Sequence, residues 1–247
     1  MAERVAFVTG GGRGVGANVA RALAEDGWSV IVAARTRDEV QAVAADTGGR
    51  ALELDVCSPE SIEHAFAEAG QIDLLVNNAG ISGPRGRSWE VDPADWWRVH
   101  EVNVRGAYLC ACAVIPGMLE RGAGRIVNVG SGAAYLRDSG GSSAYGSSKA
   151  GLHRFSERLA QELKPLGITV FEISPGLVRT SMTDGFPDDA PWTPPEAAPA
   201  LVLKLASGRY DELAGLYLHA EHDDVDELLA RLDDVRERDL NAIRLQR

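Results

Sequence analysis

Short runs rich in β-branched residues alternate with helical patterns along most of this chain, and that alternation limits the folds it can adopt. Each run is bounded by Gly, Pro, Asn or Asp, as strands usually are. The runs are residues 4–9, 29–34, 51–54, 72–76, 124–129, 168–173 and 216–219. Between them apolar residues recur at helical spacing, as in the series Val15, Val19, Ala22, Leu23 and the series Leu152, Phe155, Leu159, Leu163.

Alternating strands and helices build a parallel sheet with helices on both of its faces. Right-handed crossovers between the strands make such a sheet doubly wound. We therefore predict an α/β fold, a single doubly wound domain with a parallel sheet of about seven strands. This domain is expected over residues 1–220. Residues 221–247 are predicted to form a charged helical tail, with an apolar face of Val225, Leu228, Leu229 and Leu232, that packs on the domain or on a partner subunit.

Charge and composition exclude several other classes of protein. The chain has 25 Lys and Arg against 36 Asp and Glu, whereas nucleic-acid binders need a basic surface to neutralise phosphates. No apolar run approaches the roughly 20 residues that span a bilayer, and the charged N-terminus is unlike a signal peptide. These two features predict a protein without nucleic-acid or membrane partners. Three cysteines cannot form a disulfide framework, so we expect a reduced, cytoplasmic protein. No metal site is predicted, because Cys110 and Cys112 lie in an apolar segment and the histidines are scattered.

A glycine-rich segment, TGGGRGVG at residues 9–16, joins the first predicted strand to a helix. Gly10, Gly14 and Gly16 let the backbone turn tightly and approach a pyrophosphate, and Gly16 also lets helix and strand pack closely. The helix N-terminus offers free N–H groups and a partial positive charge to phosphates. A plain turn would also explain a glycine cluster, but the strand before it and the helix after it favour dinucleotide binding.

Further motifs follow in a fixed order along the chain. They are Asn77-Asn78-Ala79-Gly80 after the fourth strand, Asn103 in EVNVRG, Ser131 after the fifth strand, the YxxxK pair Tyr145 and Lys149, and Pro175-Gly176 after the sixth strand. With the glycine segment, this series resembles the short-chain dehydrogenase/reductase family over residues 4–220. The resemblance implies a Rossmann-like fold and an oxidoreductase that transfers hydride between a nicotinamide cofactor and a carbonyl or alcohol carbon.

The resemblance also implies a set of cofactor-binding residues, in which Asp55 and Val56 contact the adenine and Thr180 contacts the carboxamide. Thr180 could instead be a helix cap. The full set is Gly10, Gly12, Arg13, Gly14, Val15, Gly16, Arg35, Asp55, Val56, Asn78, Ala79, Gly80, Tyr145, Lys149, Pro175, Gly176, Val178 and Thr180.

The end of the second strand indicates NADP(H) rather than NAD(H). An acidic residue there would bond the 2′-hydroxyl of the adenosine ribose and repel a 2′-phosphate. This chain has Ala34 followed by Arg35, with Arg37 near and Arg13 in the glycine segment. Guanidinium groups suit phosphate because their planar fork donates two hydrogen bonds at once. Solvated surface arginines are the alternative explanation.

Tyr145 and Lys149 are four residues apart and so share one face of a helix. A nearby ammonium favours the phenolate form of a tyrosine, and the same lysine can bond the nicotinamide ribose. We predict that Tyr145 donates a proton to the developing alkoxide as general acid while Ser131 supports that oxygen. By the resemblance, Asn103 holds a water that passes protons to Lys149. Ser131 is chosen for its place after the fifth strand over three rivals, Ser139, Ser142 and Ser143.

Two segments should flank the substrate, residues 81–87 and the proline-rich residues 180–195, since a long irregular loop in a compact domain is often functional. Candidate lining residues are Tyr135, Leu136, Phe186 and Trp192.

The predicted activity is reduction of a ketone or aldehyde to an alcohol, with a ketoacyl group or a secondary-metabolite carbonyl as candidate substrates. Two alternatives stand beside it: an alcohol dehydrogenase working in the oxidative direction with NAD(P)+, and a non-catalytic nucleotide-sensing regulator. A sensor could lose the Tyr and Lys that this chain keeps. The chain lacks the final Gly-Gly pair that helps many family members form a subunit interface, yet we still expect a homodimer or homotetramer built on the long helical segments 93–120 and 143–164.

Overall fold

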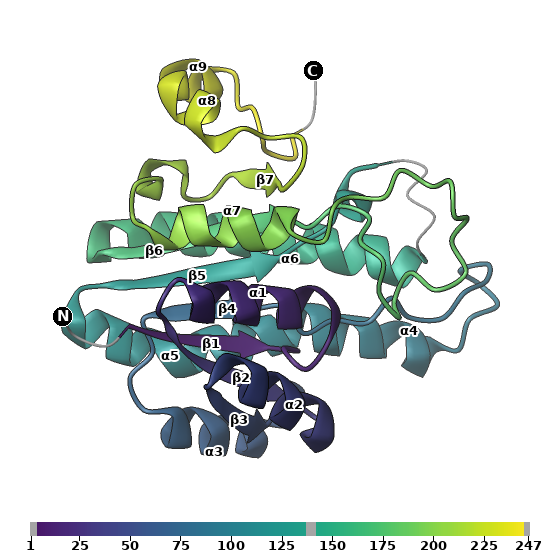
Figure 1. Ribbon diagram of the computed structural model, residues 1–247. Coiled ribbons are helices and arrows are strands. Elements are labelled where there is room, and N and C mark those ends of the chain that lie inside the picture. Colours follow the sequence, from purple (N-terminus) through teal and green to yellow (C-terminus); the bar gives the residue numbers. More distant parts are fainter. Residues whose placement is uncertain (1–3, 137–141, 245–247) are drawn as a thin grey trace.

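A parallel sheet of seven strands forms the centre of the computed structural model, which describes residues 4–136 and 142–244 (Figure 1). The strand order within these residues is β3-β2-β1-β4-β5-β6-β7, and every neighbouring pair is parallel. The strands are β1 Val5–Thr9, β2 Ser29–Ala34, β3 Arg50–Glu53, β4 Leu74–Asn77, β5 Gly124–Val129, β6 Ile168–Ser174 and β7 Tyr217–His219. This sheet confirms the predicted doubly wound fold, with strand ends shifted by at most two residues.

Helices cover both faces of the sheet, and successive residues of one strand face opposite layers. In β1, Ala6 and Val8 join one core cluster and Phe7 joins the other, as a strand that is buried on both sides requires. The first layer contains α1 Gly14–Glu25, α2 Arg37–Thr47 and α7 Ala197–Ala206. The second contains α3 Pro59–Ala69, α5 Ala107–Arg121 and α6 Ser143–Leu163.

One helical run, Pro93–Arg121, is long and apolar enough to cross a membrane by length and composition, which the sequence pattern did not predict. It consists of α4 Pro93–His100, the π-helical turn η1 Glu101–Gly106 and α5. Its apolar side belongs to the protein core, since Cys110 and Met118 are fully buried there. Burial raises the pKa of the Cys110 thiol to about 12, which keeps that thiol protonated. The buried apolar residues of this run therefore belong to a core helix that packs in the second layer.

The tail contains two short helices where the sequence pattern predicted one. They are α8 Val225–Ala230 and α9 Leu232–Glu237, and they lie beyond β7 at one edge of the sheet (Figure 1). The chain leaves helical geometry at Arg231, which allows both Leu228 of α8 and Val235 of α9 to bury their side chains in the first core cluster. The segment after α9 then returns to β7, where Asn241 bonds both the N–H and the carbonyl group of Tyr217.

Candidate active site

The two loops that follow β1 and β4 meet at the point where the strand order reverses, the position at which open α/β sheets bind ligands. Asn78 joins them, because its Nδ2 donates to the carbonyl oxygens of Thr9 (3.1 Å) and Gly10 (3.0 Å). In return, the Oγ1 of Thr9 accepts from the backbone N–H groups of Asn78 and Ala79, both at 3.1 Å. These bonds hold the glycine segment against the end of β4.

Glycine is required at several positions of this segment for different reasons. Gly10 and Gly14 have φ angles of 62° and 55°, in the left-handed region that side chains disfavour. At Gly16, a Cβ atom would overlap Nδ2 of Asn78 and lie 2.5 Å from the carbonyl oxygen of Gly10. The helix α1 can therefore begin directly under the loop, with its N-terminal N–H groups facing the crevice.

We expect Gly16→Ala to weaken dinucleotide binding at least about tenfold and to lower the free energy of unfolding by about 1–3 kcal/mol. The added methyl group displaces the Asn78 side chain, which joins the two loops by its hydrogen bonds to Thr9 and Gly10. Fluorescence titration with NADPH and thermal unfolding measure the two effects. Gly117→Ala in α5 is the matched control, since a Cβ there would meet only the far end of the Arg121 side chain at 3.3 Å. Unchanged NADPH affinity in the Gly16 variant would contradict this assignment of the loop.

A cavity of about 490 Å³ lies beside the loops that follow β1 and β4, at the carboxyl edge of the sheet. Of the residues predicted to bind a cofactor, all line it except Gly16, Gly176 and Val178, which lie beneath or beside its wall. Several lining residues had not been singled out from the sequence: Thr36, Glu39, Leu54, Val102, Val129 and Gly130. They come from four separate parts of the chain that only the fold brings together. Ser181 and Met182 line the cavity from within the segment 180–195 that was predicted to flank the substrate.

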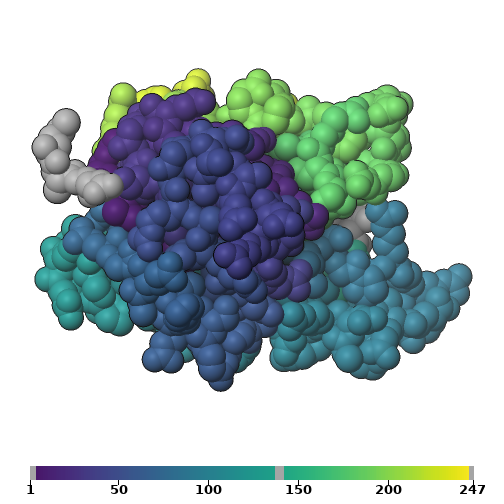
Figure 2. All heavy atoms as spheres, turned by 60° about the horizontal axis from the view of Figure 1, so that its bottom comes forward, coloured from purple at the N-terminus to yellow at the C-terminus, as the bar shows by residue number. Residues whose placement is uncertain are grey.

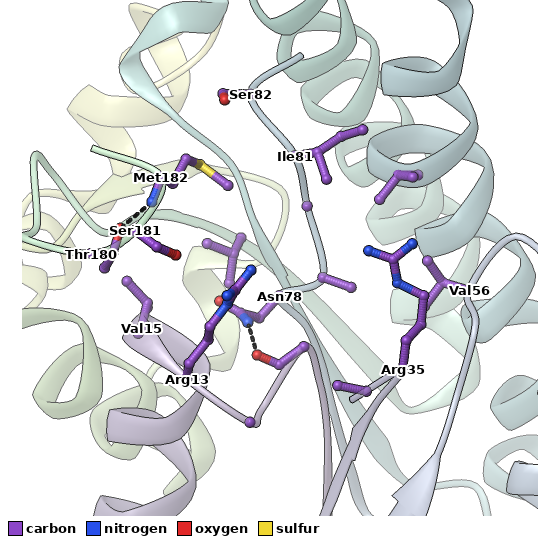
Figure 3. A pocket seen from close by; sticks show the side chains of 18 of the residues that line it. Arg13, Val15, Arg35, Val56, Asn78, Ile81, Ser82, Thr180, Ser181 and Met182 are labelled. Atoms are coloured by element: carbon purple, nitrogen blue, oxygen red, sulfur yellow. Dashed lines mark hydrogen bonds between the residues drawn. The ribbon is translucent and has the colours of Figure 1, made fainter. Parts of the chain in front are cut away.

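Two arginines line the cavity. Arg13 extends from the glycine segment and Arg35 from the residue after β2 (Figure 3). Arg13 is paired with Glu39 of α2, at 3.5 Å between Nη1 and Oε1, and most of its side chain is exposed. Arg37, the third arginine considered, lies outside the cavity lining on α2.

Tyr145 and Lys149 both line the cavity from α6. The Nζ of Lys149 lies 5.7 Å from the centre of the Tyr145 ring and donates to the carbonyl oxygen of Val129 at 2.7 Å. The Lys149 side chain is buried, so water screens its charge only weakly. Helix α6 begins beside them because Ser142 caps it: its Oγ accepts from the Tyr145 N–H at 3.2 Å.

The serines near the fifth strand take different structural positions. Ser131 stands two residues after the end of β5, is half-buried and caps the short helix η2 Gly132–Ala134 by accepting from the Ala133 N–H. Ser142 caps α6 and donates to the carbonyl oxygen of Ser82, while Ser143 accepts from Nε1 of Trp96. Ser139 lies outside the described residues. Ser131 is outside the cavity lining, next to the lining residue Gly130, and its role as the polarising group stays a prediction.

Asn103 lies in the π-helical turn η1 and is fully buried. Its Nδ2 donates to the carbonyl oxygen of Ile81 and to Oγ of Ser148, and its Oδ1 accepts from the Ile81 N–H at 2.9 Å. The side chain therefore fixes the loop after β4 to α6. A role in passing protons to Lys149 stays a prediction for this residue.

The segments predicted to flank the substrate project at one end of the molecule, where surfaces near residues 80–95 (blue) and 180–195 (green) face each other across a hollow (Figure 2). Arg85 connects them by donating to the carbonyl oxygen of Asp184 at 3.0 Å. Thr180 lines the cavity and packs over Gly14. The candidate aromatic residues are outside the lining: Phe186 and Trp192 pack on each other, and Tyr135 is exposed.

Comparisons with known proteins agree on one family. The model of the family described as short chain dehydrogenase matches residues 4–191. The chain is 33% identical to "Short chain dehydrogenase pigC" of Monascus ruber over 95% of its own length and 84% of that protein. It is 36% identical to the 3-oxoacyl-[acyl-carrier-protein] reductase FabG of Escherichia coli over 75% of its own length and 78% of that protein. The structure of an actinorhodin polyketide ketoreductase with NADPH superposes with a TM-score of 0.81 at 29% identity, covering 88% of this chain and 95% of that one.

Proposed function

This chain belongs to the short-chain dehydrogenase family of oxidoreductases, and from that premise we propose that it is an NADP(H)-dependent enzyme that reduces a ketone or aldehyde to an alcohol. The observation that carries the proposal is the convergence of Tyr145, Lys149 and the glycine segment on one cavity. That cavity fits a dinucleotide, since Gly10, Gly12 and Gly14 line it without side chains, which leaves room for a pyrophosphate, and Arg13 and Arg35 line it as well. When bound, the nicotinamide supplies the hydride.

The side chains of the protein then act on the carbonyl oxygen of the substrate. Tyr145 donates its hydroxyl proton to the carbonyl oxygen as negative charge develops there. Ser131 donates a hydrogen bond to the same oxygen and stabilises that charge. Lys149 keeps a positive charge beside the Tyr145 ring, which favours the phenolate left after proton transfer. Its other N–H groups can bond the hydroxyl groups of the nicotinamide ribose and orient the ring.

Three observations support NADP(H) as the cofactor. Ala34 stands where an acidic residue would repel a 2′-phosphate. Arg13 and Arg35 line the cavity near that point. The actinorhodin ketoreductase of similar structure carries NADPH.

The names of the relatives suggest a class of substrate. One reduces 3-oxoacyl groups on acyl carrier protein and another is a polyketide ketoreductase, so we propose a ketoacyl or secondary-metabolite carbonyl. We further propose a soluble, cytoplasmic enzyme that acts as a homodimer or homotetramer. Exposed Tyr108 and Leu119 on α5 suit such an assembly.

We expect Arg35→Asp to shift cofactor preference toward NADH, because it replaces a phosphate-binding guanidinium by a carboxylate that repels the 2′-phosphate. Loss of one charge-assisted pair, worth about 1.5–3 kcal/mol, corresponds to a change of roughly ten- to a hundredfold in the ratio of kcat/KM for the two cofactors. Arg37→Asp serves as the control, since it makes the same charge change on α2 outside the cavity. An unchanged ratio in the Arg35 variant would show that this guanidinium does not select the cofactor.

The proposed function itself is tested with a panel of β-ketoacyl thioesters, aromatic ketones, aldehydes and secondary alcohols, followed by nicotinamide absorbance with NADPH and with NADH. The account predicts oxidation of NADPH by at least one carbonyl class and faster turnover with NADPH than with NADH. Binding of NADPH without turnover of any panel member would favour a nucleotide sensor.

A further inference from the structure

A buried ionisable pair lies behind the catalytic residues, and the mechanism above does not use it. His153 stands on α6 one turn beyond Lys149, and Glu172 stands on β6. Both side chains are almost fully buried, at 3% and 1% exposed, and Nδ1 of His153 lies 3.2 Å from Oε2 of Glu172. A buried carboxylate is costly unless its partners are held in good geometry, so this pair requires a reason in the structure around it.

The C-terminal segment completes the pair. The backbone N–H of Ile243 donates to Nε2 of His153 at 3.4 Å. With Nε2 accepting from this N–H, Nδ1 is the ring nitrogen that faces Glu172 and can donate to it. The imidazole thus connects the end of the chain to the central sheet.

The same segment holds α6 at a second point. Arg244 pairs with Glu157, which stands one turn beyond His153 and is itself buried. Burial opposes ionisation of this carboxyl group, but the hydrogen bonds from Arg244 and Arg154 outweigh it and hold the pKa of Glu157 below its ordinary value. Tyr145, Lys149, His153 and Glu157 follow one another at four-residue spacing, so each is a neighbour of the next along α6, and the attachment points continue the row that begins with the catalytic pair.

Glu172 extends the connection to the end of β5. Its Oε1 packs directly on Gly130, where a Cβ atom would overlap it. Gly130 stands between Val129, whose carbonyl oxygen holds Lys149, and Ser131. The carboxylate therefore lies against the backbone that positions Ser131 and, through the Val129 carbonyl group, Lys149.

We propose that His153 and Glu172 are positioning residues of the active site, and that the C-terminal segment 241–244 holds them in place through the N–H of Ile243. This inference rests on the proposed function. The segment fixes α6 from one side and, through the imidazole and the carboxylate, fixes the end of β5 from the other. Lys149 and Ser131 are thereby held at a constant separation during the reaction.

A pair of substitutions at Ile243 separates the backbone bond from the side chain. Ile243→Pro removes the N–H that His153 accepts, whereas Ile243→Ala keeps it and shortens a side chain that is already 37% exposed. We expect kcat to fall about 10- to 100-fold in the proline variant, the range that a small misplacement of reacting groups produces. The KM for NADPH should change less than about threefold, and the alanine variant should keep most of the activity of the wild type.

A second pair of substitutions is made at Glu172 on β6. It tests the same connection without a proline that could impair folding. Glu172→Gln retains an oxygen that can accept from Nδ1 of His153, and Glu172→Leu does not. The account predicts that the glutamine variant retains most of kcat and that the leucine variant loses as much as Ile243→Pro. Equal kcat in the proline and alanine variants, or equal loss in the glutamine and leucine variants, would overturn the proposal.

One readout does not depend on turnover. Nitrogen-15 NMR of the His153 imidazole should show the Nδ1–H tautomer in the wild type and in Ile243→Ala, and a changed signal in Ile243→Pro. A different tautomer in the wild type would overturn the proposal even if the enzyme proves active. If this signature is present but no carbonyl is reduced, the proposed function fails and the structural connection stands.

Discussion

Replacement of Tyr145 by phenylalanine should lower kcat about 10²- to 10⁴-fold, the range typical of a lost general acid. The substitution removes only the hydroxyl oxygen, and the ring that packs beside Lys149 stays in place. NADPH should therefore bind with an affinity within about threefold of the wild type, because the lost group acts on the substrate oxygen and forms no bond that cofactor binding requires. Steady-state rates at saturating NADPH and a fluorescence titration measure the two quantities.

Tyr108→Phe is the matched control for this experiment. Tyr108 is an exposed tyrosine on α5, outside the cavity lining, and loses the same atom. Its kcat should equal that of the wild type. Turnover at the wild-type rate in the Tyr145 variant would remove this hydroxyl from the mechanism, whatever the cofactor affinity.

Lys149→Met should lower kcat/KM by a similar factor, about 10²- to 10⁴-fold, and should also weaken NADPH binding. The substitution removes the charge that favours the phenolate and the donor proposed to hold the nicotinamide ribose. Because methionine has a similar length, the buried site stays filled. The carbonyl oxygen of Val129 loses its donor, at a cost of about 1–3 kcal/mol in the free energy of unfolding.

The two variants differ in cofactor binding, and that difference tests the assigned roles. Tyr145→Phe should leave NADPH affinity nearly unchanged, whereas Lys149→Met should reduce it. Lys164→Met removes an exposed lysine paired with Glu212 at the far end of α6 and is expected to behave as the wild type. Equal NADPH affinity in the Lys149 variant and the wild type would show that this ammonium does not hold the ribose.

The sequence predicts those features whose signals are local. Strand and helix alternation predicts the sheet. The glycine segment predicts a tight turn before a helix, in which Gly10 and Gly14 adopt the positive φ angles that glycine accommodates. The four-residue spacing of Tyr145 and Lys149 predicts their common face because helix geometry fixes it.

Features that depend on contacts between distant segments are not predictable in this way. The sequence assigns no role to His153, since its partner Glu172 is 19 residues away on another element and Ile243 is 90 residues away. Glu39 enters the cavity only because α2 packs beside the glycine segment. The tail forms two helices because the burial of Leu228 and Val235 outweighs the continuous helical pattern.

The central claim is that the Tyr145 hydroxyl faces the nicotinamide ring and the reacting oxygen. A crystal structure of the protein with NADP+ and a carbonyl substrate analogue measures this directly. The account predicts that the hydroxyl lies within about 3 Å of the carbonyl oxygen, with Lys149 bonded to the nicotinamide ribose. A hydroxyl group directed away from the nicotinamide in that complex would contradict the account.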